Sequence, residues 1–212
     1  MADTLVTSET LASAFKTTQE LYVNDSGTDV KVNGRQILDL VGDSIGNASV
    51  ANQAVSAATS TYLVGSSLPV PPAKLRIGTQ FLWRMAATKT AAGVAARSFF
   101  IRIGTAGSTA DTAVATLTST SLPTAAIDEG HFEIIATIRG PLSSVCVIEA
   151  QIRMFHNGNT TGFAVIPLTV NRLTSSVTFD ATVANLIVGL SLTSGSSEAI
   201  TFTQISAESK NL

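Results

Sequence analysis

A two-residue alternation of apolar and polar side chains is the feature of this sequence that most constrains its fold. Successive side chains of a β-strand point to opposite faces of a sheet, so this period predicts strands with one buried and one polar face. Four segments carry the alternation, at 75–86, 130–139, 145–156 and 185–192. Their predicted buried residues are Leu75, Ile77, Phe81, Trp83 and Met85; Phe132, Ile134, Ala136 and Ile138; Cys146, Ile148, Ala150, Ile152 and Met154; and Leu186, Val188, Leu190 and Leu192.

Weaker strand signals fill much of the chain between 61 and 206, separated by Gly, Pro, Asn and Ser. Gly140-Pro141 is a turn signal, which predicts that the segments on either side of it form a hairpin. Strands of this number and spacing pack as two antiparallel sheets face to face. The weaker predicted strands lie at 61–67, 97–104, 113–118, 162–170, 176–180 and 199–206.

The chain before residue 44 carries helical signals. Leu11, Phe15 and Tyr22 recur at roughly helical spacing, which predicts a short helix over 8–21. A short strand is predicted at 30–33. A second short helix is predicted over 34–41.

The apolar residues of the second helix are Ile37, Leu38, Leu40 and Val41, and Gly42 suits its C-terminal cap. Residues 44–60 are small and polar without strong periodicity, which predicts an extended linker. The predicted organisation is therefore an N-terminal attachment arm at 1–43, a linker at 44–60 and a β-sandwich domain at 61–212.

Charge and cysteine content exclude several classes of function. Only 13 % of the residues are charged, about half the usual share near 25 %. The net charge is −2 and no run of Lys or Arg occurs, so no nucleic-acid partner is expected. The single cysteine, Cys146, excludes a disulfide within the chain. The N-terminus has no signal-peptide pattern and no stretch approaches ~18 apolar residues, so no membrane partner is expected.

The residues that could carry chemistry are few. His131 and His156 are the only histidines, and the predicted hairpin brings them to one end near Asp128 and Glu129. That set matches no metal-ligand spacing, so no metal site is predicted. Asp128 and Glu129 are neighbours on a strand and point to opposite faces, which disfavours a shared-proton pair.

Three further motifs have structural interpretations. Cys146 and Trp83 fall on apolar strand faces, which predicts core positions rather than a nucleophile or a ligand platform. The Gly-x-x-Gly at 104–107 follows a strand and precedes no helical pattern, so it predicts a turn rather than a phosphate site. With no catalytic constellation and no cofactor motif, the sequence predicts a protein that is not an enzyme and holds no cofactor.

A longer pattern runs through the β region. Its parts are Leu75-Arg76-Ile77-Gly78-Thr79, Phe81-Leu82-Trp83-Arg84, Thr88-Lys89-Thr90-Ala91-Ala92-Gly93, Phe100-Ile101-Arg102-Ile103-Gly104-Thr105-Ala106-Gly107, Glu133-Ile134-Ile135-Ala136-Thr137-Ile138-Arg139 and Phe179-Asp180-Ala181-Thr182-Val183-Ala184-Asn185-Leu186. Over roughly 61–208 the pattern resembles a jelly-roll domain of structural proteins from tailed bacteriophages. The resemblance implies an antiparallel two-sheet jelly-roll sandwich that trimerises, similar in shape to tumour-necrosis-factor and complement-type heads.

The expected function follows from this resemblance. The chain is expected to be a virion protein, made in the bacterial cytoplasm, that decorates or cements the capsid as a homotrimer bound to the major capsid protein or other virion proteins. The alternative is a tail-fibre or receptor-binding protein that recognises a host surface glycan or protein. The expected attachment residues are the apolar set of the arm, Leu11, Phe15, Ile37, Leu38, Leu40 and Val41.

Overall fold

The computed structural model describes residues 20–25, 28–33, 44–56, 58–71, 73–89, 96–118, 127–156, 163, 172–173, 176–196 and 198–212. The chain divides into two compact units, Met1–Asp43 and Ser44–Leu212. The described residues are mainly β and contain no helix.

The first unit contains an antiparallel hairpin of β1 (Glu20–Asp25) and β2 (Thr28–Asn33). Strand β2 includes the strand that the sequence predicts at 30–33. The helix predicted over 8–21 cannot extend to its predicted end, because Glu20 and Leu21 belong to β1. The rest of that helix and the helix predicted at 34–41 lie outside the described residues.

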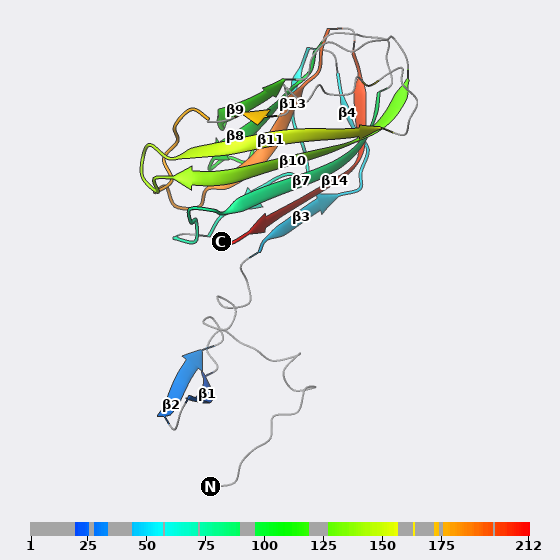
Figure 1. Cartoon of the computed structure of the whole chain (residues 1–212). Helices are drawn as coiled ribbons and strands as arrows, with labels where there is room; N and C mark the ends of the chain where they lie inside the picture. Colours follow the sequence, from blue (N-terminus) through cyan, green and yellow to red (C-terminus); the bar gives the residue numbers. More distant parts are fainter. Residues whose placement is uncertain are drawn as a thin grey trace. The chain divides into compact units, whose positions relative to one another are not determined.

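The second unit contains two antiparallel sheets (Figure 1). The larger has the order β12-β11-β10-β7-β14-β3, and β4 also pairs with β14. Its strands are β3 (Gly46–Ser49), β4 (Gln53–Val55), β7 (Gln80–Lys89), β10 (Asp128–Gly140), β11 (Val147–His156), β12 (Arg172–Leu173) and β14 (Ile200–Lys210).

The smaller sheet has the order β5-β13-β8-β9, and β6 also pairs with β13. Its strands are β5 (Ser60–Tyr62), β6 (Leu68–Pro69), β8 (Ser98–Gly104), β9 (Thr112–Thr118) and β13 (Ile187–Thr193). The pairing between strands is nested along the chain. The first strands, β3 and β4, pair with the last, β14; β5 and β6 pair with β13; β7 pairs with β10; and β8 pairs with β9.

The apolar faces of the two sheets meet in one core. Phe81, Trp83 and Met85 of β7 are fully buried there, as the alternation predicts. Phe99 of β8 lies across from Phe132 of β10, with ring centroids 5.2 Å apart. The Trp83 indole N–H donates to the Ser66 carbonyl oxygen at 2.7 Å, so its polar atom is satisfied inside the core.

Residues 44–60 belong to the sandwich, where the sequence predicts a linker. Strands β3 and β4 lie within this segment and pair with β14. Small residues such as Ala48 and Ala54 occupy exposed positions of these strands. An edge strand of Gly, Ala, Ser and Asn buries little apolar surface, so it leaves no apolar alternation in the sequence.

Other predicted strands differ from the structure in detail. Of the segment predicted as one strand at 61–67, only Thr61 and Tyr62 lie in a strand, β5, and β6 begins after the segment at Leu68. Of 176–180, Phe179 forms only an isolated bridge with Cys146. Of 162–170, only residue 163 is described.

Ile77 breaks the predicted alternation, since its side chain is 64 % exposed. The cause is a turn before β7, in which the Thr79 N–H donates to the Arg76 carbonyl at 3.1 Å. Gly78 has φ of +90° in this turn, a conformation that glycine adopts without steric cost. The strand therefore starts at Gln80, after the turn has rotated Ile77 out of the core.

Candidate functional surface

The outer face of the larger sheet presents side chains in cross-strand rows. The strand register gives each row one residue from β14, one from β7, one from β10 and one from β11, in that order. Starting from the C-terminal end of β14, they are Lys210–Gln80–Thr137–Glu149, Glu208–Leu82–Ile135–Gln151, Ser206–Arg84–Glu133–Arg153 and Gln204–Ala86–His131–Phe155.

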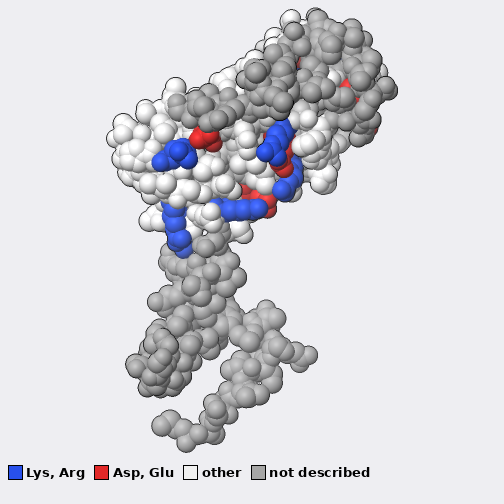
Figure 2. Space-filling view, in the orientation of Figure 1, with Lys and Arg blue, Asp and Glu red and all other residues white. Residues whose placement is uncertain are grey.

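Ion pairs connect the central rows. The Arg84 guanidinium lies 3.4 Å from the Glu133 carboxylate and 3.3 Å from the Glu208 carboxylate. Lys210 lies 3.5 Å from Glu208, and Arg153 lies 4.0 Å from Glu133. These groups are partly exposed, so each pair contributes at most about 1 kcal/mol to stability. Blue and red residues are mixed on this face in Figure 2, so its described residues form no continuous basic surface for phosphates.

A shallow hollow of about 290 Å³ lies at the last of these rows. It forms because Ala86, a small residue, lies between Gln204 and His131 in the register. Phe155, which is 56 % exposed, is part of its lining, together with Thr88, Glu129 and Thr203. An aromatic face beside an imidazole, a carboxylate and hydroxyl groups can bind a small polar ligand or a partner side chain.

A buried cluster of charges lies at the end of the sandwich where β7 finishes and β10 begins. Arg97 and Glu198 are 1 % and 0 % exposed, and their Nη2 and Oε1 atoms are 2.6 Å apart. Lys89 and Asp128 are also buried, so the cluster holds two cations and two anions. Burial lowers the pKa of Arg97 to about 10, although the Glu198 carboxylate acts in the opposite direction. Burial likewise lowers the pKa of Lys89.

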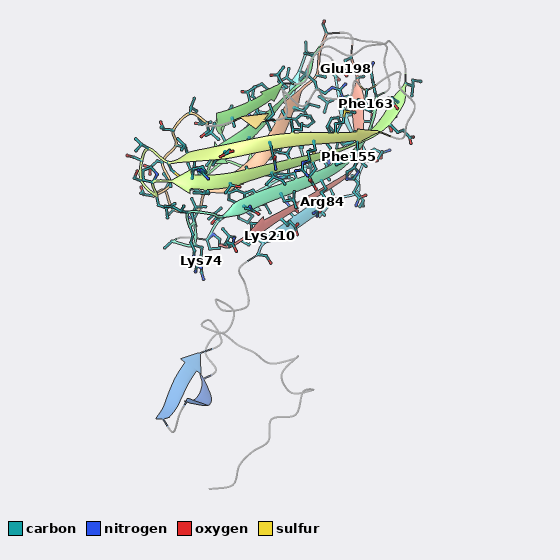
Figure 3. The ribbon with its side chains drawn as sticks, viewed as in Figure 1. Lys74, Arg84, Phe155, Phe163, Glu198 and Lys210 are labelled. Carbon is teal, nitrogen blue, oxygen red and sulfur yellow. The ribbon has the colours of Figure 1, made fainter. Side chains whose placement is uncertain are left out.

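The cluster binds neighbouring chain segments together. The Arg97 guanidinium carbon lies 4.6 Å from the ring centroid of Phe163. The Phe163 N–H donates to Asp128 Oδ2 at 2.7 Å, and the Gly195 N–H donates to Glu198 Oε2 at 3.2 Å. Figure 3 shows Phe163 and Glu198 at the same end of the sandwich. Charged groups buried in this way hold the neighbouring segments in place.

The residues considered above for a metal site, His131, His156, Asp128 and Glu129, do not share one face of the hairpin in the structure. Asp128 is buried whereas Glu129 is exposed, so the two carboxylates face opposite sides. His131 pairs with Phe155 and His156 pairs with Gly130, so the two histidines occupy positions of opposite parity on their strands. Within the described ranges, no group of three metal-binding side chains occurs.

The remaining candidate positions have structural roles. Cys146 is fully buried, and burial raises the pKa of its thiol, which opposes nucleophilic reactivity. At 104–107, the Ala106 N–H donates to Asp111 Oδ1 at 2.9 Å and the Ser108 N–H donates to Oδ2 at 3.2 Å. A carboxylate of the chain therefore already occupies amides that a phosphate would need.

The attachment residues predicted in the arm, Leu11, Phe15, Ile37, Leu38, Leu40 and Val41, lie outside the described residues. Phe155 and the pair Arg97–Glu198 are not among the residues that the sequence predicts for a site. Phe155 has a local signal, because it is an aromatic residue at a polar position of the alternation in β11. Arg97 and Glu198 have none, since they are far apart in the sequence.

Comparisons with known proteins give distant structural likenesses. No family model matches the chain, and no curated protein matches it. Two solved structures of infectious bursal disease virus align over 90 % and 88 % of this chain, at 10 % and 13 % identity with TM-scores of 0.26 and 0.25. The first is of the Gx strain, and the second is the VP2 subviral particle. The chain spans less than half the length of these viral chains, 46 % and 44 %.

A third structure is the alginate lyase Aly36B, a mutant in complex with an alginate trisaccharide. It aligns over 85 % of this chain and 99 % of its own length, at 11 % identity with a TM-score of 0.21. Scores this low carry no argument about function. The part of the chain that the structure describes contains no helix long and apolar enough to cross a membrane.

Proposed function

We propose that this chain is a structural protein of a tailed-phage virion, which attaches to the capsid through its N-terminal segment and displays a jelly-roll domain. The observation that carries the proposal is the nested strand pairing, in which the first strands pair with the last and each inner pair follows in turn. That winding is the arrangement of a jelly roll, two Greek keys folded into two sheets. It supports the phage-protein resemblance, which rests on residues of the same strands.

The division into two units suits this role. Residues 1–43 form a unit apart from the sandwich, and they contain seven acidic and three basic residues. A segment that orders on a partner can cover a large surface with few residues. We assign attachment to the apolar set Leu11, Phe15, Ile37, Leu38, Leu40 and Val41, with the major capsid protein as the partner.

We also propose that the sandwich forms a homotrimer. The low overall charge of the chain and the exposed Thr112, Thr116 and Thr118 on β9 of the smaller sheet allow close packing of copies around a symmetry axis. Native mass spectrometry of the purified chain tests this directly. A trimer mass supports the proposal, and a monomer at micromolar concentration refutes it.

The attachment test is incorporation into virions. Replacing Ile37, Leu38, Leu40 and Val41 by Ser is expected to leave the sandwich folded, because these residues lie in the other unit, and to remove the chain from purified virions. Circular dichroism of the variant controls for folding. Incorporation equal to that of the wild type would refute the assigned contacts.

The alternative function is recognition of a host surface glycan or protein at the tail. The hollow beside Phe155 favours it, because an exposed aromatic residue flanked by polar groups is a recurrent feature of binding sites. Binding of the fluorescent chain to host cells tests this alternative, with Phe155→Ser as the site variant. Cell binding that Phe155→Ser abolishes would favour receptor recognition over decoration.

A further inference from the structure

We propose that one end of the sandwich is a second docking surface, which binds the same particle protein as the N-terminal segment. This inference rests on the proposed function and names a further contact region for that partner. The end in question is the one at which the second unit begins, at Ser44; it is called the proximal end below. The partner surface that fits it presents an apolar side chain with carboxylates on one side.

The proximal end exposes a group of apolar side chains. Ile77 is 64 % exposed, Val145 53 %, and Leu142 and Val183 are each 42 % exposed. Leu142 and Val183 border a hollow of about 230 Å³, which Val70, Pro71, Ala73, Leu75, Ala181 and Leu186 also line. Every residue in that lining is apolar. Clustered exposed apolar residues of this kind mark interaction sites, whereas single ones are ordinary.

Backbone hydrogen bonds hold this surface in a fixed form. The Gly78 N–H donates to the Ile138 carbonyl at 2.9 Å, which fixes the turn that carries Ile77. The Ala181 N–H donates to the Ser143 carbonyl at 2.9 Å, which joins the loop of Val183 to the turn of Leu142 and Val145. The Ile77 side chain packs against Gly140, since a Cβ added to Gly140 would lie 2.9 Å from the Cδ1 atom of Ile77. A preformed surface loses little conformational entropy on binding.

The chain enters the sandwich at the same end. The Ser209 N–H donates to the Ile45 carbonyl at 2.8 Å, and the Thr79 hydroxyl donates to the Asn211 carbonyl at 2.7 Å. The start of β3, the end of β14 and the turn before β7 are therefore neighbours. Between β3 and β10 lie three strand spacings of about 4.8 Å, so Ile45 lies roughly 15 Å from Ala136 of β10, and β10 continues from there to the turn at Gly140.

This proximity makes the particle protein the occupant that the structure favours. When the N-terminal segment is bound, its covalent junction at Ser44 holds the proximal end near the same partner. A second contact there becomes intramolecular and gains a high effective concentration, so a modest apolar patch adds substantially to retention. The opposite end of the sandwich gains no such advantage.

Charge around the patch indicates the chemistry of the partner. Lys74 and Arg76 flank Leu75, one of the residues that line the hollow, and Figure 3 shows Lys74 at this end with Lys210 nearby. Asp180 is the acidic residue closest in sequence to Val183, and its carboxylate accepts hydrogen bonds from the Thr182 N–H and hydroxyl. Lys74 and Arg76 therefore favour a partner with carboxylates on their side of its apolar contact.

The test compares matched apolar-to-polar variants at the two ends. Ile77→Ser combined with Val145→Ser alters the patch at exposed positions, which limits the effect on folding. Ile127→Ser is the control, because Ile127 is 72 % exposed and precedes Asp128, which pairs with Lys89 at the opposite end. Thermal melts of each full-length variant verify that it folds.

The measurement is the rate at which each fluorescently labelled chain dissociates from purified virions after dilution. The patch variant is expected to dissociate about tenfold faster than the wild type, as loss of a central apolar contact typically produces. Ile127→Ser is expected to match the wild type. A further variant, Arg76→Glu, is expected to accelerate dissociation more than Arg76→Ala, because it places like charges together.

Each outcome has a distinct meaning. If the wild-type chain is absent from virions, the proposed function and this inference both fail. If the wild type is present and the patch variant dissociates at the same rate, only the inference fails. Equal acceleration by Ile127→Ser also overturns it. Loss of oligomer mass with an unchanged dissociation rate would assign the patch to contacts between copies and reject the particle as its occupant.

Discussion

Replacing Glu198 by Gln is expected to destabilise the sandwich strongly. The Arg97 guanidinium is 1 % exposed, and its nearest carboxylate oxygen, Glu198 Oε1, is 2.6 Å away. Removing that negative charge leaves a buried cation whose desolvation is no longer offset by a charge at this distance. Breaking a buried ion pair in this way costs about 3–5 kcal/mol of unfolding free energy.

The expected cost is large relative to the total stability of a domain, which is typically about 5–15 kcal/mol. For a chain of this size, each kcal/mol lowers the midpoint of thermal unfolding by roughly 2–4 °C, so the variant should melt about 6–20 °C lower. Urea unfolding followed by circular dichroism gives the same quantity as a shift in midpoint at constant slope. The loss should change little with salt, because the pair is shielded from solvent.

Glu208→Gln is the matched control, since it removes a carboxylate from an exposed ion-pair row. Glu208 is 36 % exposed and lies 3.3 Å from Arg84, so the expected cost is below about 1 kcal/mol. Converting both Arg97 and Glu198 to Met should recover most of the stability lost in Glu198→Gln, because no unpaired charge then remains in that pair. A cost for Glu198→Gln within 1 kcal/mol of the control would refute the reasoning.

Three further outcomes follow from the packing of individual residues. Gly189→Ala should cost about 1–3 kcal/mol, because its Cβ would overlap the Tyr62 hydroxyl, and Tyr62→Ala in the same chain should reduce that penalty in urea melts. Burial raises the pKa of Tyr62 from 10.0 to about 12. The neutral form of Tyr62 therefore stabilises the fold below pH 10, and this contribution is lost as the pH rises through 12. Tyrosinate absorbance should show a late titration that Tyr62→Phe removes. Cys146 should resist alkylation in the folded chain and react at once in urea, and rapid labelling of the native protein would contradict its burial.

Local alternation was sufficient to predict the centre of the fold. Strand β10 buries Phe132, Ile134, Ala136 and Ile138 as its sequence indicates, because a half-buried strand in a sandwich requires that period. The same rule failed for Ile77, because the turn at the positive-φ Gly78 makes β7 begin at Gln80, later than the start of the alternating pattern. The exposed position of Ile77 in the apolar patch at the proximal end could therefore not be predicted from the alternation.

The edge strands and the buried charges could not be predicted, for different reasons. Strands β3 and β4 depend on hydrogen bonds to β14, a partner that follows them by most of the length of the chain. Their small residues give no local signal of that pairing. Arg97 and Glu198 each look like an ordinary surface charge in the sequence, and only the fold brings them together. The hollow beside Phe155 was predictable in part, since an aromatic residue at a polar position of a strand indicates an exposed contact.

Quantitative mass spectrometry of purified virions tests the central claim most directly, by giving the copies of this chain relative to the major capsid protein. A structural role on the shell predicts a copy number proportional to that of the capsid protein. A few copies per particle, in multiples of three, would move the chain to the tail and favour receptor recognition. Absence from virions in which the chain was expressed would contradict a structural role altogether.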